Sequence, residues 1–311
     1  VLALYGLGTL HLLGSRDKSF SHKRRPDPAG VVDLRNRANQ RRRVVFIRHG
    51  ESAWNEVFNR GFGPGFPVRL VSAWLQELSR VHLGDSVFLD SPLSPAGLAQ
   101  VEALRDFLRA EDAAGAAGGV EAAEVVRLLR GRGDASQRST VVASNLRRAL
   151  ATACLGLQDR LSATGERVRV VSCLQEISRN VDTISMAPKG GVVDIPTCDG
   201  RVIRSEAILD GALNRGNKPV RGTGLHRLDK FANWAFDECS HETIVVGGHS
   251  LFFREFFRAF LPREVDGLAA RAKKRKMHNC GVVSFNLVRD GEGKGFCIDP
   301  DTLTPVYLGF S

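Results

Sequence analysis

Long apolar runs are missing from this 311-residue sequence. A membrane-spanning helix needs about 20 consecutive apolar residues. The longest candidate, residues 1–14, is shorter than that and contains His11, so we expect no transmembrane segment. Because the chain begins with Val rather than Met, the apolar tail of a targeting or anchor segment is the alternative interpretation of residues 1–14.

Cysteine is scarce and scattered: there are six residues and no C-x-x-C pair. No histidine stands at metal-ligand spacing from any of them. The sequence therefore indicates neither a zinc site nor a disulfide framework. We expect reduced thiols, a cytoplasmic location, no bound metal and no cofactor.

Acidic residues are in the minority, and the excess of positive charge is uneven along the chain. The formal charge is +10, but residues 1–43 alone hold ten Lys or Arg against three Asp. A second basic cluster occupies residues 271–276. Such tracts are commonly solvated tails, although some are localisation signals or weak binders of acidic polymers and lipids. We expect residues 1–43 to be a basic flexible lead, with no specific binding of nucleic acid.

The remainder of the chain is typical of a globular protein, with 43% hydrophobic and 25% charged residues overall. Apolar runs rich in β-branched residues predict buried strands; they occupy residues 44–47, 139–143, 168–171, 243–247 and 282–288, with another near 303–308. Apolar residues spaced three or four apart predict helices; these cover residues 94–110, 146–161 and 223–238, and a further helix begins near Ser250. Residues 111–120 are expected to be a loop. Strands alternating with helices predict an α/β fold, a three-layer α/β/α sandwich with a mostly parallel sheet.

The first predicted strand runs into Arg48-His49-Gly50-Glu51-Ser52, and Trp54-Asn55 follows. This motif resembles the R-H-G-E-S-x-W-N signature of the mutase-type branch of the histidine phosphatase superfamily, which has the phosphoglycerate mutase-like fold. Later segments match the same family in the expected order: Asp90 to Gly97 fits D-x-x-L-S-x-x-G, Ser144 to Ala149 fits S-x-L-x-R-A, and Leu174-Gln175-Glu176 and Gly248-His249-Ser250 follow. The resemblance covers residues 44 to about 290 and implies a histidine phosphatase domain over residues 44–311.

The residue types suit phosphoryl transfer. A neutral imidazole is a nucleophile near pH 7, and the resemblance makes His49 the residue that becomes phosphohistidine. Arg48 and Arg148 supply planar pairs of N–H donors for phosphoryl oxygens. Arg147 competes with Arg148 for this role; the register of the motif selects Arg148 and leaves Arg147 as a surface charge.

Three further site residues are predicted. His249 completes the cage around the phosphoryl group, and Asn55 donates a hydrogen bond to a phosphoryl oxygen. By resemblance, Glu176 protonates the leaving group and then activates water. Arg254, five residues after His249, faces either the pocket or solvent.

Two segments depart from the mutase pattern. Insertions are expected near residues 64–89 and 179–222. The second is rich in cations, which either suit an anionic substrate or are plain surface charges. The leading hypothesis is a metal-independent phosphomonoester hydrolase acting on a phosphorylated small molecule or phosphoprotein. A phosphoglycerate-type phosphomutase is the alternative within the family. A non-catalytic scaffold or nucleic-acid-associated protein that uses the basic segments is the alternative from another class.

Overall fold

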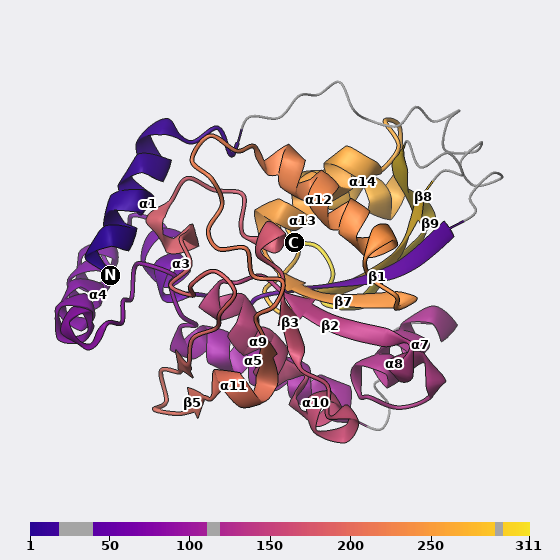
Figure 1. Ribbon diagram of the computed structural model, residues 1–311, viewed down its shortest axis with the longest axis horizontal. Coiled ribbons are helices and arrows are strands. Elements are labelled where there is room, and N and C mark those ends of the chain that lie inside the picture. The colour runs from indigo at the N-terminus through magenta and orange to yellow at the C-terminus, as the bar shows by residue number, and fades with distance from the viewer. Residues whose placement is uncertain (19–39, 111–118, 290–294) are drawn as a thin grey trace.

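The computed structural model describes residues 1–18, 40–110, 119–289 and 295–311 (Figure 1). Within these residues, seven strands form one sheet in the order β6-β3-β2-β7-β1-β8-β9. Their bounds are β6 Leu209–Asp210, β3 Val168–Val170, β2 Ser139–Ala143, β7 Thr243–Gly248, β1 Gln40–Arg48, β8 Val282–Arg289 and β9 Phe296–Tyr307. Neighbouring strands from β6 to β1 are parallel, whereas β8 is antiparallel to both β1 and β9. The predicted mostly parallel sheet is confirmed.

Helices cover both faces of the sheet (Figure 1). One layer contains α12 Gly224–Asp237, α13 Ser250–Phe260 and α14 Gly267–Lys274. The opposite layer contains α5 Pro95–Arg109, α7 Val120–Leu129, α8 Asp134–Gln137, α9 Arg147–Gly156 and α10 Gln158–Thr164. Alternate residues of β1 divide between the layers: Val44 and Phe46 belong to the first core, and Val45 and Ile47 belong to the second. This is the predicted three-layer sandwich.

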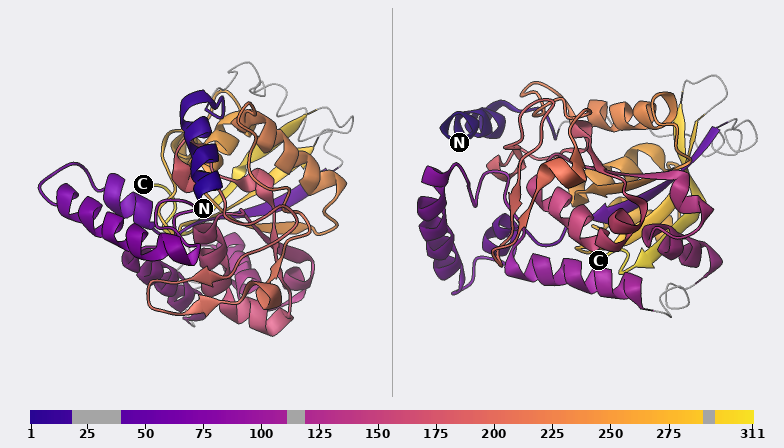
Figure 2. Two further views of the ribbon diagram at one scale, coloured as in Figure 1. Left: turned by 60° about the vertical axis from the view of Figure 1, so that its left-hand side comes forward. Right: turned by 60° about the horizontal axis from the view of Figure 1, so that its bottom comes forward.

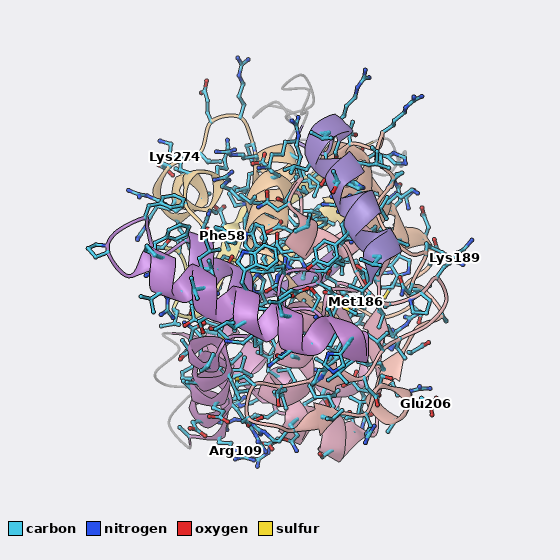
Figure 3. All side chains as sticks on the ribbon, turned by 90° about the vertical axis from the view of Figure 1, so that its left-hand side faces the viewer. Phe58, Arg109, Met186, Lys189, Glu206 and Lys274 are labelled. Carbon is cyan, nitrogen blue, oxygen red and sulfur yellow. The ribbon has the colours of Figure 1, made fainter. Side chains whose placement is uncertain are left out.

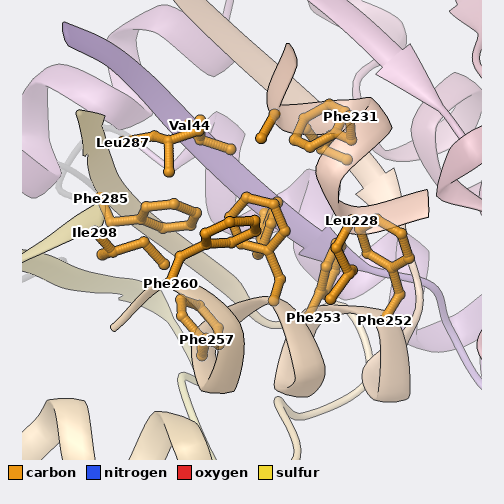
Figure 4. Close-up of a cluster of buried hydrophobic side chains, with 14 of the residues drawn as sticks. Val44, Leu228, Phe231, Phe252, Phe253, Phe257, Phe260, Phe285, Leu287 and Ile298 are labelled. Carbon is orange, nitrogen blue, oxygen red and sulfur yellow. The ribbon is translucent and has the colours of Figure 1, made fainter. Parts of the chain in front are cut away.

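Phenylalanine dominates the first core (Figure 4). Phe46 of β1 stacks on Phe253 of α13 with ring centroids 4.0 Å apart, and Phe285 of β8 meets Phe46 edge-on at 4.9 Å. Both arrangements are favourable for aromatic pairs. The helix that follows His249 is therefore fixed against the strand that precedes His49.

Most predicted elements are present, and one predicted helix is divided into two. Thr223 and Ser94 cap α12 and α5 through their side chains, as their positions before the apolar repeats suggest. The helix predicted over residues 146–161 is divided at Leu157 into α9 and α10. Most of the loop predicted at residues 111–120 lies outside the described residues.

The two predicted insertions contain regular structure. After the short helix α3 Ala53–Phe58, residues 66–80 form α4 Phe66–Arg80, and η1 Val81–Leu83 follows it. The second insertion contains η3 Val181–Thr183, the two-stranded sheet β4 Ile195–Pro196 with β5 Val202–Ile203, and α11 Ser205–Ile208. The turn η2 Ser172–Leu174 precedes it.

The prediction of a flexible lead over residues 1–43 is wrong at both ends. Residues 2–14 form the helix α1 Leu2–Gly14, and β1 begins at Gln40 rather than at Val44. Asp17, which follows α1, is 2% exposed and accepts from Lys218 Nζ at 3.0 Å and from an Arg227 guanidinium nitrogen at 2.7 Å. Composition suggested a solvated tail because the partners of Asp17 lie about 200 residues away in the sequence. Residues 19–39 lie outside the described residues.

No helix in the described ranges is long and apolar enough to cross a membrane. The six cysteines form no disulfide.

The burial of Asp17 leads to a stability prediction. Asp17→Asn should lower the free energy of unfolding by about 3–5 kcal/mol, because it leaves two buried cations without their counter-ion. Urea denaturation measures this change. The matched control is Glu242→Gln, which breaks the exposed pair with Arg138 and should change stability little. Equal changes in the free energy of unfolding for the two variants would contradict the conclusion that the ion pairs of Asp17 stabilise the fold.

Candidate active site

The two histidines are brought together by the pairing of β1 with β7. In this parallel pair Arg48 lies opposite Gly248, so the residues that follow, His49 and His249, emerge side by side. The backbone N–H of His49 donates to the Gly248 carbonyl at 3.0 Å, and the ring centroids are 5.1 Å apart. Both side chains are buried.

The contacts of His49 define its tautomer. Its Nδ1 lies 2.5 Å from the carbonyl oxygen of Gly50, which can only accept a hydrogen bond. Nδ1 therefore carries the hydrogen, and the lone pair is on Nε2. Burial, followed by the charges of Arg148 and Arg48, lowers the pKa of His49 well below its usual value. The imidazole is thus neutral at pH 7, with Nε2 available as a nucleophile.

The side chain of His249 lacks partners in the described structure. Both ring nitrogens are buried, and neither has a hydrogen-bond partner among the described residues. Buried polar atoms are nearly always satisfied in proteins, so a buried pair without partners indicates a place for a ligand. Burial and the charge of Arg148 hold the pKa of His249 well below its usual value.

Two arginines surround these rings. Arg48 donates to the Met277 carbonyl through one terminal nitrogen, while its Nε is buried without a partner among the described residues. Arg148, in the first turn of α9, is almost fully buried. After burial, the charges of Arg148 and Arg48 lower the pKa of His49, so both arginines lie within electrostatic reach of this histidine.

Arg147 is buried rather than exposed, so its prediction as a surface charge is wrong. Its guanidinium donates to Asp85 and to the carbonyl oxygens of Ser86 and Leu89, and its backbone N–H donates to Asp90 Oδ1 at 2.8 Å. Arg147 therefore anchors the start of α9. Arg148 pairs with Asp182, and after burial its charge is the largest influence that lowers the pKa values of His49 and His249.

Glu176 accepts three backbone hydrogen bonds. Its Oε1 accepts from Ile177 at 2.8 Å and from Phe252 at 2.9 Å, and its Oε2 accepts from Leu251 at 3.3 Å. Two of these donors belong to the first turn of α13, directly after His249. The carboxylate therefore occupies the helix N-terminus, where negative charge is favoured.

Asp182, in η3, is a site residue that the sequence analysis missed. It is 5% exposed; its Oδ2 lies 3.3 Å from an Arg148 nitrogen, and its Oδ1 has no partner among the described residues. Burial raises the pKa of Asp182 to about 6, Arg148 opposes this rise, and the charge of Glu176 adds to it. No sequence signal identified Asp182, because it lies within the insertion that matches no family segment.

The two remaining predicted residues differ in their placement. In the described part of the chain no hydrogen bond joins Asn55 to the histidines or arginines; its side-chain oxygen accepts from Asn59 at 2.9 Å. Arg254 donates to Glu255 at 3.3 Å, and its side chain is 24% exposed. Burial, followed by the charges of Arg48 and Arg254, lowers the pKa of Lys276.

The loop between β1 and α3 is held by very close backbone packing. A Cβ atom on Gly97 would lie 1.9 Å from the carbonyl oxygen of Glu51, so only glycine fits at this position. Ser94 caps α5 and donates to the Glu51 carboxylate at 3.0 Å. These contacts explain why the D-x-x-L-S-x-x-G segment accompanies the R-H-G-E-S motif.

The N-terminal segment also supports the site. Lys218 Nζ, which pairs with Asp17, donates to the Glu176 carbonyl at 2.7 Å, and Arg227 donates to the Gln175 carbonyl. A Cβ on Gly8 of α1 would lie 2.9 Å from Val181, so α1 packs directly on the turn that carries Asp182. Residues 1–18 therefore contact Lys218, which holds the Glu176 backbone, and the turn that carries Asp182.

Comparisons with known proteins find solved structures only; a scan of protein-family models and a search of curated proteins give no match. One matching structure is the product of an open reading frame of Mycobacterium tuberculosis, with 16% identity over 87% of this chain and 98% of that chain and a TM-score of 0.36. Another is a mycobacterial glucosyl-3-phosphoglycerate phosphatase in complex with VO3, with 15% identity, coverages of 83% and 97% and a TM-score of 0.39. A phosphoserine phosphatase mutant from Entamoeba histolytica has 15% identity, coverages of 82% and 95% and a TM-score of 0.36.

Proposed function

We propose that the chain is a metal-independent phosphomonoester hydrolase that acts through a phosphohistidine. The observation that carries this proposal is the state of His49, a buried neutral imidazole whose Nδ1–H is held by Gly50 and whose Nε2 keeps its lone pair. His249 provides buried ring nitrogens without partners 5.1 Å away, measured between ring centroids. Arg48 and Arg148 supply the positive charge that a transferring phosphoryl group requires.

In the first step, His49 Nε2 attacks phosphorus; a P–N bond forms and the P–O bond to the leaving group breaks. The electron pair of that bond goes to the leaving oxygen, which takes a proton from a carboxylic acid. In the second step, a water oxygen attacks phosphorus while a carboxylate accepts its proton. The P–N bond breaks, inorganic phosphate leaves and the neutral imidazole returns. Exchange with solvent then removes the proton from the second carboxyl group and restores the proton of the first.

The contacts favour a division of the proton transfers between two carboxyl groups. Glu176 accepts three backbone N–H bonds at a helix N-terminus, which suits a carboxylate that accepts a proton from water. Asp182 is buried, has an oxygen without a described partner, and has a pKa raised to about 6. This environment suits a proton donor near neutral pH. Asp182 is therefore proposed as the general acid, a role that the family resemblance gave to Glu176.

Phosphoryl transfer to His49 is tested by trapping the intermediate. A ³²P-labelled phosphomonoester, quenched without acid, should label the wild-type protein with a bond that is stable to alkali and labile to acid, as expected for a phosphoramidate. His49→Ala should remove the label entirely. His226→Ala, which alters an exposed histidine of α12, should leave it unchanged. Labelling that persists in His49→Ala would exclude His49 as the nucleophile.

The roles of the two carboxyl groups are separated by the choice of leaving group. Asp182→Asn should slow hydrolysis of an alkyl phosphate by about 10²–10⁴-fold and hydrolysis of an aryl phosphate with an acidic phenol much less, because only the alkoxide needs the proton. Glu176→Gln should instead slow attack by water, so the aryl ester gives a rapid burst of phenol followed by slow turnover. Stopped-flow and steady-state rates measure both effects. A burst with Asp182→Asn and none with Glu176→Gln would reverse the assignment.

The pH dependence follows from the same groups. The raised pKa of Asp182 keeps this carboxyl group protonated below about pH 6. The pKa of His49 is well below its usual value, so the imidazole is neutral near pH 6. For an alkyl phosphate, kcat/KM should therefore fall as the pH rises above about 6. The substrate also ionises in this region, so the same profile is measured with Asp182→Asn, which should show a shallower alkaline decline. An identical decline in both proteins would show that the ionisation of Asp182 does not control the rate.

Hydrolase and phosphomutase activities are distinguished by their products. With 3-phosphoglycerate and a trace of the 2,3-bisphosphate, we expect release of inorganic phosphate or no reaction, because the segment after Gly63 departs from the mutase pattern. Formation of 2-phosphoglycerate without phosphate release would identify a mutase.

A further inference from the structure

Exposed apolar side chains are concentrated on two segments of the described structure. All the large exposed hydrophobic residues except Val120, Val202 and Leu308 belong either to α1 or to residues 62–83. Every exposed hydrophobic side chain on these two segments is at least 51% exposed. On α1 these residues are Leu2, Leu10, Leu12 and Leu13, and on residues 62–83 they are Phe62, Val68, Val71, Trp74, Leu75, Leu78 and Leu83. Such a concentration is unusual for a surface that faces only water.

The exposed residues of α4 follow the helical repeat. Val68, Val71, Leu75 and Leu78 are spaced three and four apart, so they form one stripe along the helix. The opposite side of α4 packs on α3 and on residues 87–88 through Ala73 and its partly buried neighbours. The stripe is therefore not required for the packing of α4, and it faces outward.

The helices α1 and α4 lie beside each other at the same end of the molecule (Figures 1 and 2). Tyr5 of α1 donates a hydrogen bond to the carboxylate of Glu77 on α4, and its hydroxyl lies 3.2 Å from that of Ser86. Figure 3 shows both helices at the front of one view, with Lys274 of α14 at the upper edge. We name the surface formed by the exposed residues of α1 and of residues 62–83 the α1–α4 face.

Acidic side chains are turned away from this face. Residues 1–18 and 60–84 contain two acidic residues, Asp17 and Glu77, and both are buried. Asp17 pairs with Lys218 and Arg227, and Glu77 accepts from the backbone N–H of Val87 at 2.6 Å. The cations at the end of α1, Arg16 and Lys18, remain exposed. The α1–α4 face is therefore bordered by exposed cations, and residues 1–18 and 60–84 expose no acidic side chain.

We propose that the α1–α4 face docks on the surface of an anionic phospholipid bilayer. An apolar helical stripe bordered by cations is the pattern of segments that lie in the interface of a membrane. Anionic headgroups attract the cations, and the apolar side chains enter the acyl boundary. A second copy of the chain would bring like charges together, so self-association through this face is disfavoured. This surface binding is independent of the hydrolase proposal.

Co-sedimentation with large vesicles tests the proposal on the full chain. Binding to vesicles of phosphatidylcholine with 30% phosphatidylserine should be at least tenfold stronger than binding to phosphatidylcholine alone, and 0.5 M salt should weaken it. The double variant Val71→Asp/Leu75→Asp should lose at least tenfold in partitioning. The control, Val120→Asp, changes an exposed valine on α7 and should bind as the wild type does. Circular dichroism and turnover of a soluble aryl phosphate should be the same in all three proteins.

A spectroscopic measurement reports the depth of insertion. Trp74 lies on the face and is 53% exposed, so its fluorescence should shift to the blue on vesicles and be quenched by brominated lipid. Trp74→Phe should still bind but lose this quenching. Equal binding to neutral and anionic vesicles, or no binding to either, would overturn the proposal. So would concentration-dependent self-association that the double variant abolishes, because the face would then join two copies of the chain.

Discussion

The site depends on one interaction, the parallel pairing of β1 with β7. This pairing places the ends of two strands that are 200 residues apart in register, and a histidine follows each end. The Phe46–Phe253 stack then fixes the helix after His249 against the strand before His49. The distance between the imidazoles is thus determined by the sheet and its core rather than by a flexible loop, which is the arrangement that a preorganised catalytic site requires.

Charge is balanced closely around these histidines. Arg48, Arg148 and Lys218 all lie within electrostatic reach of the imidazoles, and together with burial they favour the neutral rings. Asp17 and Asp182 compensate two of these cations through direct ion pairs. The N-terminal segment contributes to this balance, although its composition resembles a solvated tail.

The parts of the structure that were predictable depend on local sequence patterns. The apolar run at residues 44–47 indicated a buried strand, and apolar repeats indicated the helices over residues 94–110 and 223–238. The motif register selected Arg148 over Arg147 for the phosphoryl group, which stays a prediction. The sequence did not reveal Asp182 or Asp17, because each acts through partners distant in the chain. The sequence also did not reveal the burial of Arg147. A cation is expected at the surface unless buried carboxylate and carbonyl groups accept its hydrogen bonds, and these partners are distant from Arg147 in the sequence.

The central claim is that His49 is a neutral imidazole with its hydrogen on Nδ1. Nitrogen-15 NMR of the histidine-labelled protein, with His49 assigned by comparison with His49→Gln, observes both ring nitrogens directly. Between pH 5.5 and 8 we predict a protonated Nδ1 and an unprotonated Nε2, with no titration in this range. An imidazolium at pH 6, or the tautomer with hydrogen on Nε2, would contradict the account.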